Sequence, residues 1–187
     1  MTPAVGKAYV FTFDGTNVTQ QAILVASDAV ANNKFGRAVA IDGDGDTIAI
    51  GGQGGTSVSG TSSVSTEGAA YIFTRPSDAR TQGWFSTRVG NGNGAIDLSY
   101  DGQMLVVGSW GEYSSNTGAV YGFTRSGNTF GNEVKMVAND AASADRNGWD
   151  AKIAGDTGTI VNGAPQDDDG GTNAGSIYVH NSVIESY

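Results

Sequence analysis

Short apolar segments separated by polar turn residues recur along the whole chain. The strings TIAIGG and MLVVGS are apolar at successive positions, as expected for strands that are buried on both faces. In AAYIFT, Tyr71 and Phe73 fall on one face of a strand, and Ala70 and Ile72 fall on the other. No stretch has a convincing period of about 3.6 residues. The pattern therefore predicts an all-β fold with almost no helix.

Three strings of residues repeat along the chain. The first, Gly-small-x-Tyr-x-Phe, begins at Gly6, Gly68 and Gly118 and returns as GSIYVH at Gly175, at an irregular spacing of about 56 residues. A second string, such as FGRAVAIDGDGDTIAIGG, falls between these copies. A third and looser string appears as ILVASDA and KMVANDA. Each repeated unit thus contains four short strands.

The middle unit defines these strands best. We predict them at roughly 95–99, 104–108, 119–124 and 133–138. Asp101-Gly102 predicts a tight hairpin between the first two strands, because glycine accepts the positive φ that such turns impose.

Four-stranded units with this period favour the blades of a β-propeller over a solenoid, and a β-sandwich of similar strand number is the main alternative. We predict a single domain over residues 1–187, built as a propeller-like stack of about three four-stranded antiparallel blades. The units are placed at 1–34 (a partial blade), 35–92, 93–146 and 147–187.

A stack of this size would leave blade faces uncovered, because a closed propeller usually has about four to eight blades. If one face presents a few hundred Å² of apolar surface, its exposure forfeits on the order of 10 kcal/mol. We therefore expect a second copy of the chain, a different protein or more of a longer polypeptide to cover the ends.

The repeated strings resemble FG-GAP repeats, the blades of integrin-α-type β-propellers. Phe35-Gly36 matches the FG element and Gly163-Ala164-Pro165 matches GAP, whereas Gly51-Gly52 and Gly108-Ser109-Trp110 are degenerate copies of GAP. Trp149 is placed at the Phe position of a further FG element, which makes it a packing residue, as Trp84 is also expected to be. VANDAASAD resembles the link before FG in the bacterial and algal branch of the family. The resemblance covers almost the whole chain and implies adhesion or other contacts with proteins or glycans, usually outside the cell, and often calcium in blade loops.

Two acidic loops are candidates for that calcium. Asp42, Asp44 and Asp46 provide the D-x-D-x-D start of a calcium loop, but Thr47 begins the next strand and leaves no room for the later ligands. We therefore expect a structural turn, as in a calcium-poor bacterial, algal or viral branch of the family, with calcium as the alternative. A second loop carries Asp167, Asp168 and Asp169 and reads as a solvated acidic loop, with weak cation binding as its alternative. No cofactor is certain, and Ca²⁺ is the one candidate.

Charge and composition exclude several classes of partner. Nineteen acidic and ten basic residues give a formal charge of -9, which disfavours nucleic-acid binding. No apolar run approaches the roughly 18 residues of a membrane span, so no membrane insertion is expected. The chain has no cysteine, so it has no disulfide framework. Residues 1–20 lack the charged start and apolar core of a signal peptide.

Enzymatic chemistry finds little support in the sequence. The single histidine, His180, takes the place of the repeat Phe, and no nucleophile elbow, Walker loop or His-Glu-x-x-His motif occurs. A carbohydrate-active enzyme with paired carboxylates is the enzymatic alternative. We expect the protein not to be an enzyme.

A contact surface is the favoured role. Trp110, Glu112 and Tyr113 share one loop, where exposed aromatic side chains can stack on sugars or anchor a partner. The alternative is that Trp110 packs between blades in place of the GAP Pro. We predict a structural or adhesion module that contacts other protein subunits, a glycan or a host receptor, as part of a virion or cell-surface assembly. The alternative is a secreted or surface integrin-like adhesion fragment with calcium-binding loops.

Overall fold

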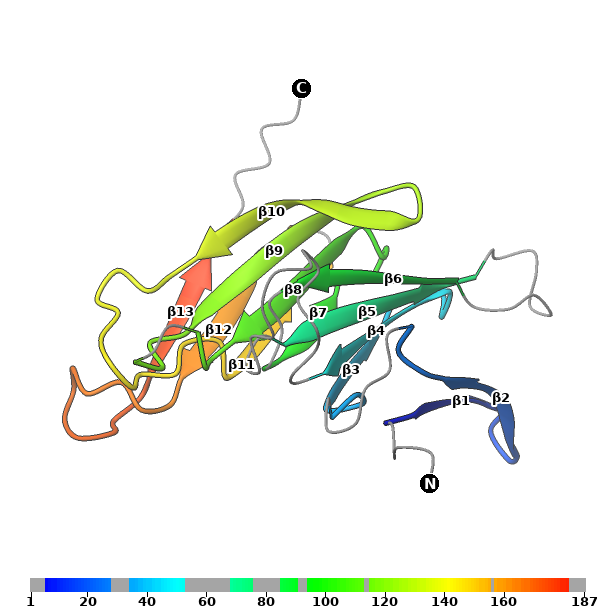
Figure 1. The fold of residues 1–187 in the computed structure, drawn as a ribbon, viewed down its shortest axis with the longest axis horizontal. Coiled ribbons are helices and arrows are strands. Elements are labelled where there is room, and N and C mark those ends of the chain that lie inside the picture. The colour runs from blue at the N-terminus through cyan, green and yellow to red at the C-terminus, as the bar shows by residue number, and fades with distance from the viewer. Residues whose placement is uncertain are drawn as a thin grey trace.

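The computed structural model describes residues 6–27, 34–52, 68–75, 94–112, 115–155 and 157–181, together with the backbone of 85–90. These ranges contain thirteen strands and no helix (Figure 1). No described segment forms a helix that is long and apolar enough to cross a membrane. The strands are β1 (Ala8–Phe13), β2 (Val18–Leu24), β3 (Ala38–Ile41), β4 (Thr47–Gly52), β5 (Ala69–Thr74), β6 (Phe85–Gly90), β7 (Ile96–Leu98), β8 (Met104–Ser109), β9 (Ala119–Ser126), β10 (Thr129–Met136), β11 (Asp150–Ile153), β12 (Ile160–Ala164) and β13 (Ser176–His180).

The strands form four antiparallel sheets in which sequence neighbours pair in order. The sheets are the N-terminal hairpin (β1-β2), blade 1 (β3-β4-β5-β6), blade 2 (β7-β8-β9-β10) and blade 3 (β11-β12-β13). Strand β7 contacts both β3 and β11, so the first strands of successive blades lie side by side. Figure 1 shows the sheets following one another from the hairpin to β13. The predicted all-β, propeller-like stack is confirmed. Each predicted unit contains one of these sheets, and the single-domain assignment stays a prediction.

Two kinds of blade face alternate through the stack. Adjacent residues of a strand point to opposite faces, so each blade has an aromatic face, which carries the repeat tyrosine, and an opposite aliphatic face. In blade 2, Tyr121 and Phe123 lie on the aromatic face and form one buried cluster with Ala70 and Ile72 of blade 1. The aromatic face of one blade therefore packs on the aliphatic face of the blade before it.

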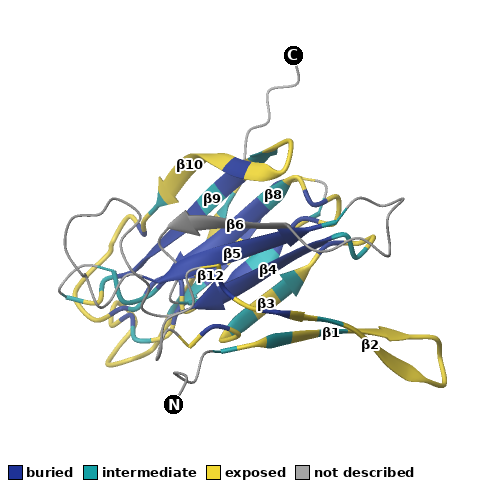
Figure 2. Cartoon of the chain, turned by 45° about the vertical axis from the view of Figure 1, so that its right-hand side comes forward, coloured by how far each residue is buried: buried dark blue, intermediate teal, exposed yellow. Residues whose placement is uncertain are grey.

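The same packing joins blade 1 to the N-terminal hairpin. Tyr71 and Phe73 are buried in a cluster against which Ala8 and Val10 of β1 pack. Phe35 meets both rings edge-on, at centroid distances of 5.4 Å to Tyr71 and 6.1 Å to Phe73. Burying one such side chain stabilises the fold by about 1.5–3 kcal/mol. Figure 2 shows the result, since β4, β5 and β8 are buried while β1 and β2 are largely exposed.

Local turn chemistry sets where the strands of blade 2 begin and end. The predicted Asp101-Gly102 hairpin forms, with Gly102 at φ 66° and its N–H donating to the Ser99 carbonyl at 2.9 Å. The Asp101 carboxylate accepts hydrogen bonds from the Ser99 hydroxyl at 2.6 Å and from the Gln103 N–H at 3.0 Å, which lower its pKa. The fourth strand begins earlier than predicted, at Thr129, because Gly127 at φ 62° closes a tight turn directly after β9.

The FG element of blade 3 lies two positions before its predicted place. Gly36 and Gly148 both have positive φ, and their N–H groups donate to equivalent carbonyls, those of Gly51 and Gly163. The residue before Gly148 is Asn147, so Asn147 takes the place of Phe35. The assignment of Trp149 to the Phe position is therefore wrong. The left-handed glycine of the FG element in blade 3 is Gly148, and Trp149 is the residue after it.

Gly148 tests how strictly the backbone needs glycine where blades 2 and 3 meet. A Cβ at Gly148 would lie 2.4 Å from the Ala119 carbonyl oxygen, and its φ is 82°. We expect Gly148→Ala to destabilise the protein by at least about 1–2 kcal/mol, which is the cost of the left-handed backbone alone. Urea denaturation measures this change.

Gly122→Ala is the matched control. A Cβ there would meet the Met136 methyl at 3.4 Å, an ordinary contact, and no positive φ is required. We expect it to raise stability by about 0.5–1 kcal/mol. Equal effects of the two substitutions would contradict this account of the junction.

Candidate functional site

The loops that connect the strands of each antiparallel sheet lie at the two ends of the blades. The turn end carries the hairpins between first and second strands, such as 42–46 and 99–103. The link end carries the connections between second and third strands, such as 110–118 and 165–175. The two predicted acidic loops therefore lie at opposite ends, with Asp42, Asp44 and Asp46 at the turn end and Asp167, Asp168 and Asp169 at the link end.

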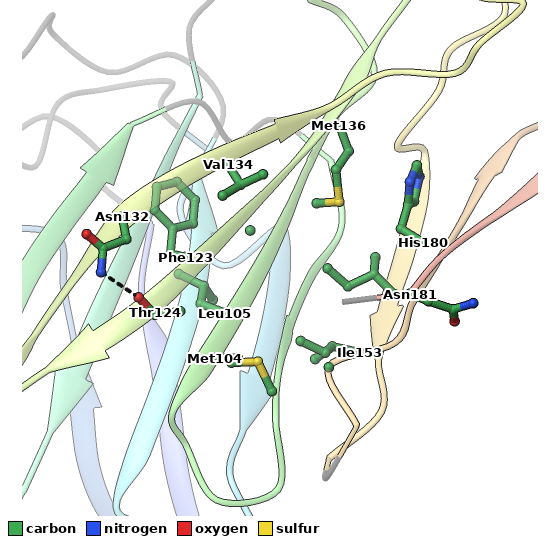
Figure 3. A pocket seen from close by; sticks show the side chains of 13 residues that line it. Met104, Leu105, Phe123, Thr124, Asn132, Val134, Met136, Ile153, His180 and Asn181 are labelled. Atoms are coloured by element: carbon green, nitrogen blue, oxygen red, sulfur yellow. Dashed lines mark hydrogen bonds between the residues drawn. The ribbon is translucent and has the colours of Figure 1, made fainter. Parts of the chain in front are cut away.

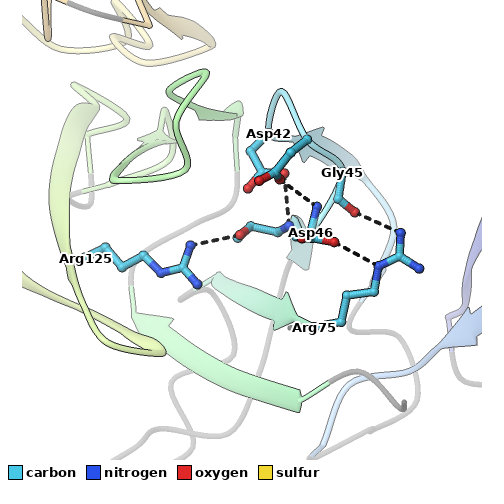
Figure 4. A network of polar contacts seen from close by, with 7 residues as sticks. Asp42, Gly45, Asp46, Arg75 and Arg125 are labelled. Atoms are coloured by element: carbon cyan, nitrogen blue, oxygen red, sulfur yellow. Dashed lines mark hydrogen bonds and ion pairs between the residues drawn. The ribbon is translucent and has the colours of Figure 1, made fainter. Parts of the chain in front are cut away.

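The turn-end aspartates are held by protein groups. Asp42 Oδ1 accepts the Thr47 N–H at 3.0 Å, and Asp44 Oδ1 accepts the Asp46 N–H at 3.1 Å. The Arg75 guanidinium pairs with the Asp46 carboxylate at 3.2 Å (Figure 4). Burial raises the pKa of Asp42. These contacts describe a tight turn in which a nearby arginine already balances part of the acidic charge.

A second arginine ties this turn to the next blade. Arg125, at the end of β9, donates from Nη1 to Thr47 Oγ1 at 3.0 Å (Figure 4). It therefore joins blade 2 to blade 1 at the rim of a polar groove of about 510 Å³. Within the described ranges, no group of three or more His, Cys, Asp or Glu side chains could hold a metal ion. Calcium binding by Asp42, Asp44 and Asp46 stays a prediction.

The link-end aspartates are also engaged with their own loop. Asp167 is buried, and its Oδ1 accepts the Asp169 N–H at 3.1 Å. Asp168 Oδ1 accepts the Asn173 N–H at 2.6 Å. The negative charges of Asp167 and Asp140 raise the pKa of Asp169. This part of the chain is an acidic loop that is folded around its first carboxylate.

That first carboxylate binds the repeat tyrosine. The Tyr178 hydroxyl lies 2.7 Å from both Asp167 Oδ2 and Asp140 Oδ1, and a phenol has one proton to donate. The Tyr178 hydrogen bond lowers the pKa of Asp167. Burial raises the pKa of Tyr178, and the two carboxylates raise it further.

Glu112 has the same role in blade 2. Gly108 pairs with Val120 next to Tyr121, as Gly163 pairs with Ile177 next to Tyr178, and an acid follows each glycine four positions later. The Tyr121 hydroxyl donates to Glu112, which also pairs with Lys135. Glu112, which the sequence suggests as a contact residue, therefore binds two side chains of its own blade. The matching Gly-x-x-x-acid spacing is visible in the sequence but was not used to predict these pairs.

Trp110 lies at the link end where blades 2 and 3 meet. Its position after Gly108 corresponds to that of Pro165, as predicted, and its ring packs on Trp149 at a centroid distance of 5.2 Å. The Arg146 guanidinium lies 5.4 Å from the centroid of each ring. Trp149 is 44% exposed, which is more than expected for a side chain that only packs between blades. Trp110, Arg146 and Trp149 form the Trp–Arg cluster. Tyr113 and Trp84 lie outside the described residues.

An apolar groove of about 350 Å³ separates the outer parts of blades 2 and 3. Its walls include Met136 of β10, Ile153 of β11 and His180 of β13 (Figure 3). In the preceding interface, the equivalent positions hold Ile72 and Phe123, which belong to one buried cluster. Gly122 and His180 are smaller than that pair, and both line the groove. Burial lowers the pKa of His180, and its Nε2 lies 3.0 Å from Asn162 Oδ1.

Comparison with known families agrees with this geometry. A model of the FG-GAP repeat matches residues 18–73 and 130–180, which is more than half of the chain. The chain belongs to the FG-GAP repeat family. Each matched stretch of this FG-GAP chain holds the outer strand of one sheet and the first three strands of the next. The FG-GAP match thus crosses two of the three junctions between successive sheets, that of the hairpin with blade 1 and that of blade 2 with blade 3. No curated protein matches the chain.

The tyrosine–acid pair of this FG-GAP chain predicts a pH-dependent effect. The folded pKa of Asp167 is lowered, so its bond to Tyr178 contributes stability above the usual Asp pKa of about 3.9 and loses it as the pH falls. We expect Tyr178→Phe to lower the urea midpoint at neutral pH, and the loss to shrink in acid. Tyr100→Phe, at an exposed position of the turn end, is the control and should change neither value. A loss that is constant with pH would contradict the pairing.

The two acidic loops predict no response to calcium. Because Arg75 and backbone N–H groups already engage one oxygen of each of Asp42, Asp46 and Asp168, we expect the melting temperature to stay constant as Ca²⁺ is added. Asp44→Asn and Asp168→Asn, one in each loop, are the comparison variants. A saturable rise in melting temperature that one of them abolishes would establish a calcium site in that loop.

Proposed function

We propose that this FG-GAP chain is a non-enzymatic structural or adhesion module that contacts a protein or glycan through its link-end loops. The observation that carries the proposal is the Trp–Arg cluster. Trp110 and Trp149 present two indole rings beside the guanidinium of Arg146, and Trp149 is partly exposed. Indole rings stack on sugar rings and anchor protein partners, and a guanidinium adds charge-assisted hydrogen bonds.

The position of the cluster supports this role. The Trp–Arg cluster joins two blades, and each ring directly adjoins a strand, since Trp110 follows β8 and Trp149 precedes β11. Binding residues are commonly carried on loops that a rigid scaffold positions. Glu112, next to the cluster in sequence, is fixed by Tyr121 and Lys135 and supports the loop that carries Trp110.

The same contacts argue against catalysis. The acids that could serve an enzyme in the described ranges, such as Asp46, Glu112 and Asp167, are paired with an arginine, a lysine or a tyrosine hydroxyl. His180 faces Asn162 at a blade junction. We therefore assign no reaction to the protein.

FG-GAP domains are typically extracellular, and we place this chain outside the cell, on a cell surface or on a virion. We infer that it belongs to the calcium-poor branch, with bacterial, algal or viral members, because arginines balance its turn-end aspartates. Its role there would be to hold other subunits, a glycan or a host receptor. An integrin-like fragment with calcium-binding loops is the alternative that the calcium titration tests.

Binding to an array of immobilised oligosaccharides tests the glycan version of this proposal. We expect Trp149→Ala to weaken binding about tenfold, the equivalent of about 1.4 kcal/mol of stacking and cation–π energy. Trp149 is partly exposed, so the substitution should leave the fold intact. Tyr100→Ala removes a 75% exposed aromatic ring from the opposite end and should bind as the wild type does. Equal binding by all three proteins would remove the Trp–Arg cluster from the function.

A further inference from the structure

Two blade faces of opposite kind are uncovered in the described structure. At one end of the stack, the aromatic face of the N-terminal hairpin is exposed, with Tyr9 and Phe11 stacked on each other at a centroid distance of 6.5 Å. Phe13, Val18 and Ile23 extend this face, because cross-strand partners share a face. Figure 2 shows the hairpin as a largely exposed ribbon beside the buried blades.

At the other end, the aliphatic face of blade 3 is exposed. Val161 of β12 pairs with Val179 of β13, and Gly163 pairs with Ile177, so these side chains lie on one face. The opposite face of blade 3 carries Ala151 and Ile160, which pack on blade 2. Val161, Ile177 and Val179 are exposed large apolar side chains. Contiguous apolar patches of this kind usually mark contacts with other molecules.

The internal interfaces show what each uncovered face fits. Tyr71 and Tyr121, the counterparts of Tyr9, are 1% and 3% exposed because each packs on the aliphatic face of the preceding sheet, whereas Tyr9 is 53% exposed. Tyr71 packs beside Ala8 and Val10 of the hairpin, and Tyr121 packs beside Ala70 and Ile72 on the third strand of blade 1. The second strand of blade 1 carries Gly51 on that same face, paired with Ala70. Blade 3 repeats the pattern of blade 1 on two strands, with Ile177 and Val179 on its third strand and Gly163 on its second. Its first strand differs, because it carries Asp150 and Lys152 on this face.

We propose that copies of this chain associate head to tail, with the aromatic face of the hairpin in one copy packed on the aliphatic face of blade 3 in the next. In this contact β1 of one copy would lie on β13 of the next, as β9 of blade 2 lies on β5 of blade 1 within the chain. The contact uses blade faces and not the Trp–Arg cluster, so it is independent of the proposed function. One chain carries both halves of the interface, which is why the partner is a second copy.

Two like faces would pair less well. An aromatic face against another aromatic face would set Tyr9, Phe11 and Phe13 against equally large rings. Well-packed apolar interfaces need complementary shapes, as protein interiors do. A head-to-tail contact is heterologous, so it either closes into a ring or continues as a filament.

Mass measurements by light scattering, over a range of protein concentrations, test the proposal. The wild type is expected to exceed the chain mass of 19.1 kDa, and the mass should rise with concentration. Phe11→Asp on the hairpin and Val179→Asp on blade 3 should each weaken association by about a hundredfold or more, because the carboxylate would be desolvated among apolar side chains. Val134→Asp is the matched control, since Val134 and Val179 are both 59% exposed, and it should leave association unchanged.

Mixing the two blocked variants makes the test specific for a head-to-tail contact. Phe11→Asp keeps an intact blade 3 face, and Val179→Asp keeps an intact hairpin. An equimolar mixture should therefore form a species of about twice the chain mass that neither variant forms alone. Circular dichroism and urea midpoints confirm folding, and Phe11→Ser with Val179→Thr replaces the pair if an aspartate variant unfolds.

Four outcomes would overturn the proposal. A wild type that stays at the chain mass at every concentration excludes self-association. Association that survives in Val179→Asp points to hairpin-on-hairpin pairing or to pairing of strand edges. A mixture that remains monomeric although the wild type associates excludes the head-to-tail geometry, and a block by Val134→Asp moves the contact to the groove beside β10.

Discussion

The packing of a repeat tyrosine and phenylalanine on the aliphatic face of the preceding sheet is the interaction on which this fold depends. It makes the two faces of a blade different, because one face carries aromatic rings and the other carries small or branched aliphatic side chains. Tyr71 and Phe73 meet the hairpin, and Tyr121 and Phe123 meet blade 1. The sheets can therefore stack in one order only, and the loops at both ends are placed by that order.

The interface between blades 2 and 3 departs from this rule and is the polar junction of the stack. Asn147, Asn162 and His180 replace Phe35, Ile50 and Phe73, and the Asn162 amide donates to Asn147 Oδ1. A hydrogen-bonded network is directional but buries less apolar area than three apolar side chains do. The loss leaves the apolar groove beside Gly122. The Trp–Arg cluster lies at the link end of this same junction, where two tilted indole rings and a guanidinium provide contact between the blades.

The sequence could predict the strands and their grouping because those depend on local pattern and turn chemistry. Asp101-Gly102 fixed one hairpin, and the Gly108 and Gly163 copies were aligned correctly. The pairing of Glu112 with Tyr121 and of Asp167 with Tyr178 depends on how the second and third strands are aligned, and the Gly-x-x-x-acid spacing is its sequence signal. Trp149 was placed wrongly for a related reason. Similarity of residue type matches Trp149 to Phe35, because both are aromatic. The backbone conformation instead matches Gly148 to Gly36, because both glycines have positive φ.

Many carboxylates in the described residues bind partners within the chain and so stabilise the fold. Asp46 balances Arg75, Asp101 caps a hairpin, and Asp167 accepts the hydroxyl of Tyr178. Carboxylates in such positions are held by internal partners and are poorly placed to serve as ligands. The contacts proposed for this chain accordingly use other groups, which are the Trp–Arg cluster at the link end and the two uncovered blade faces.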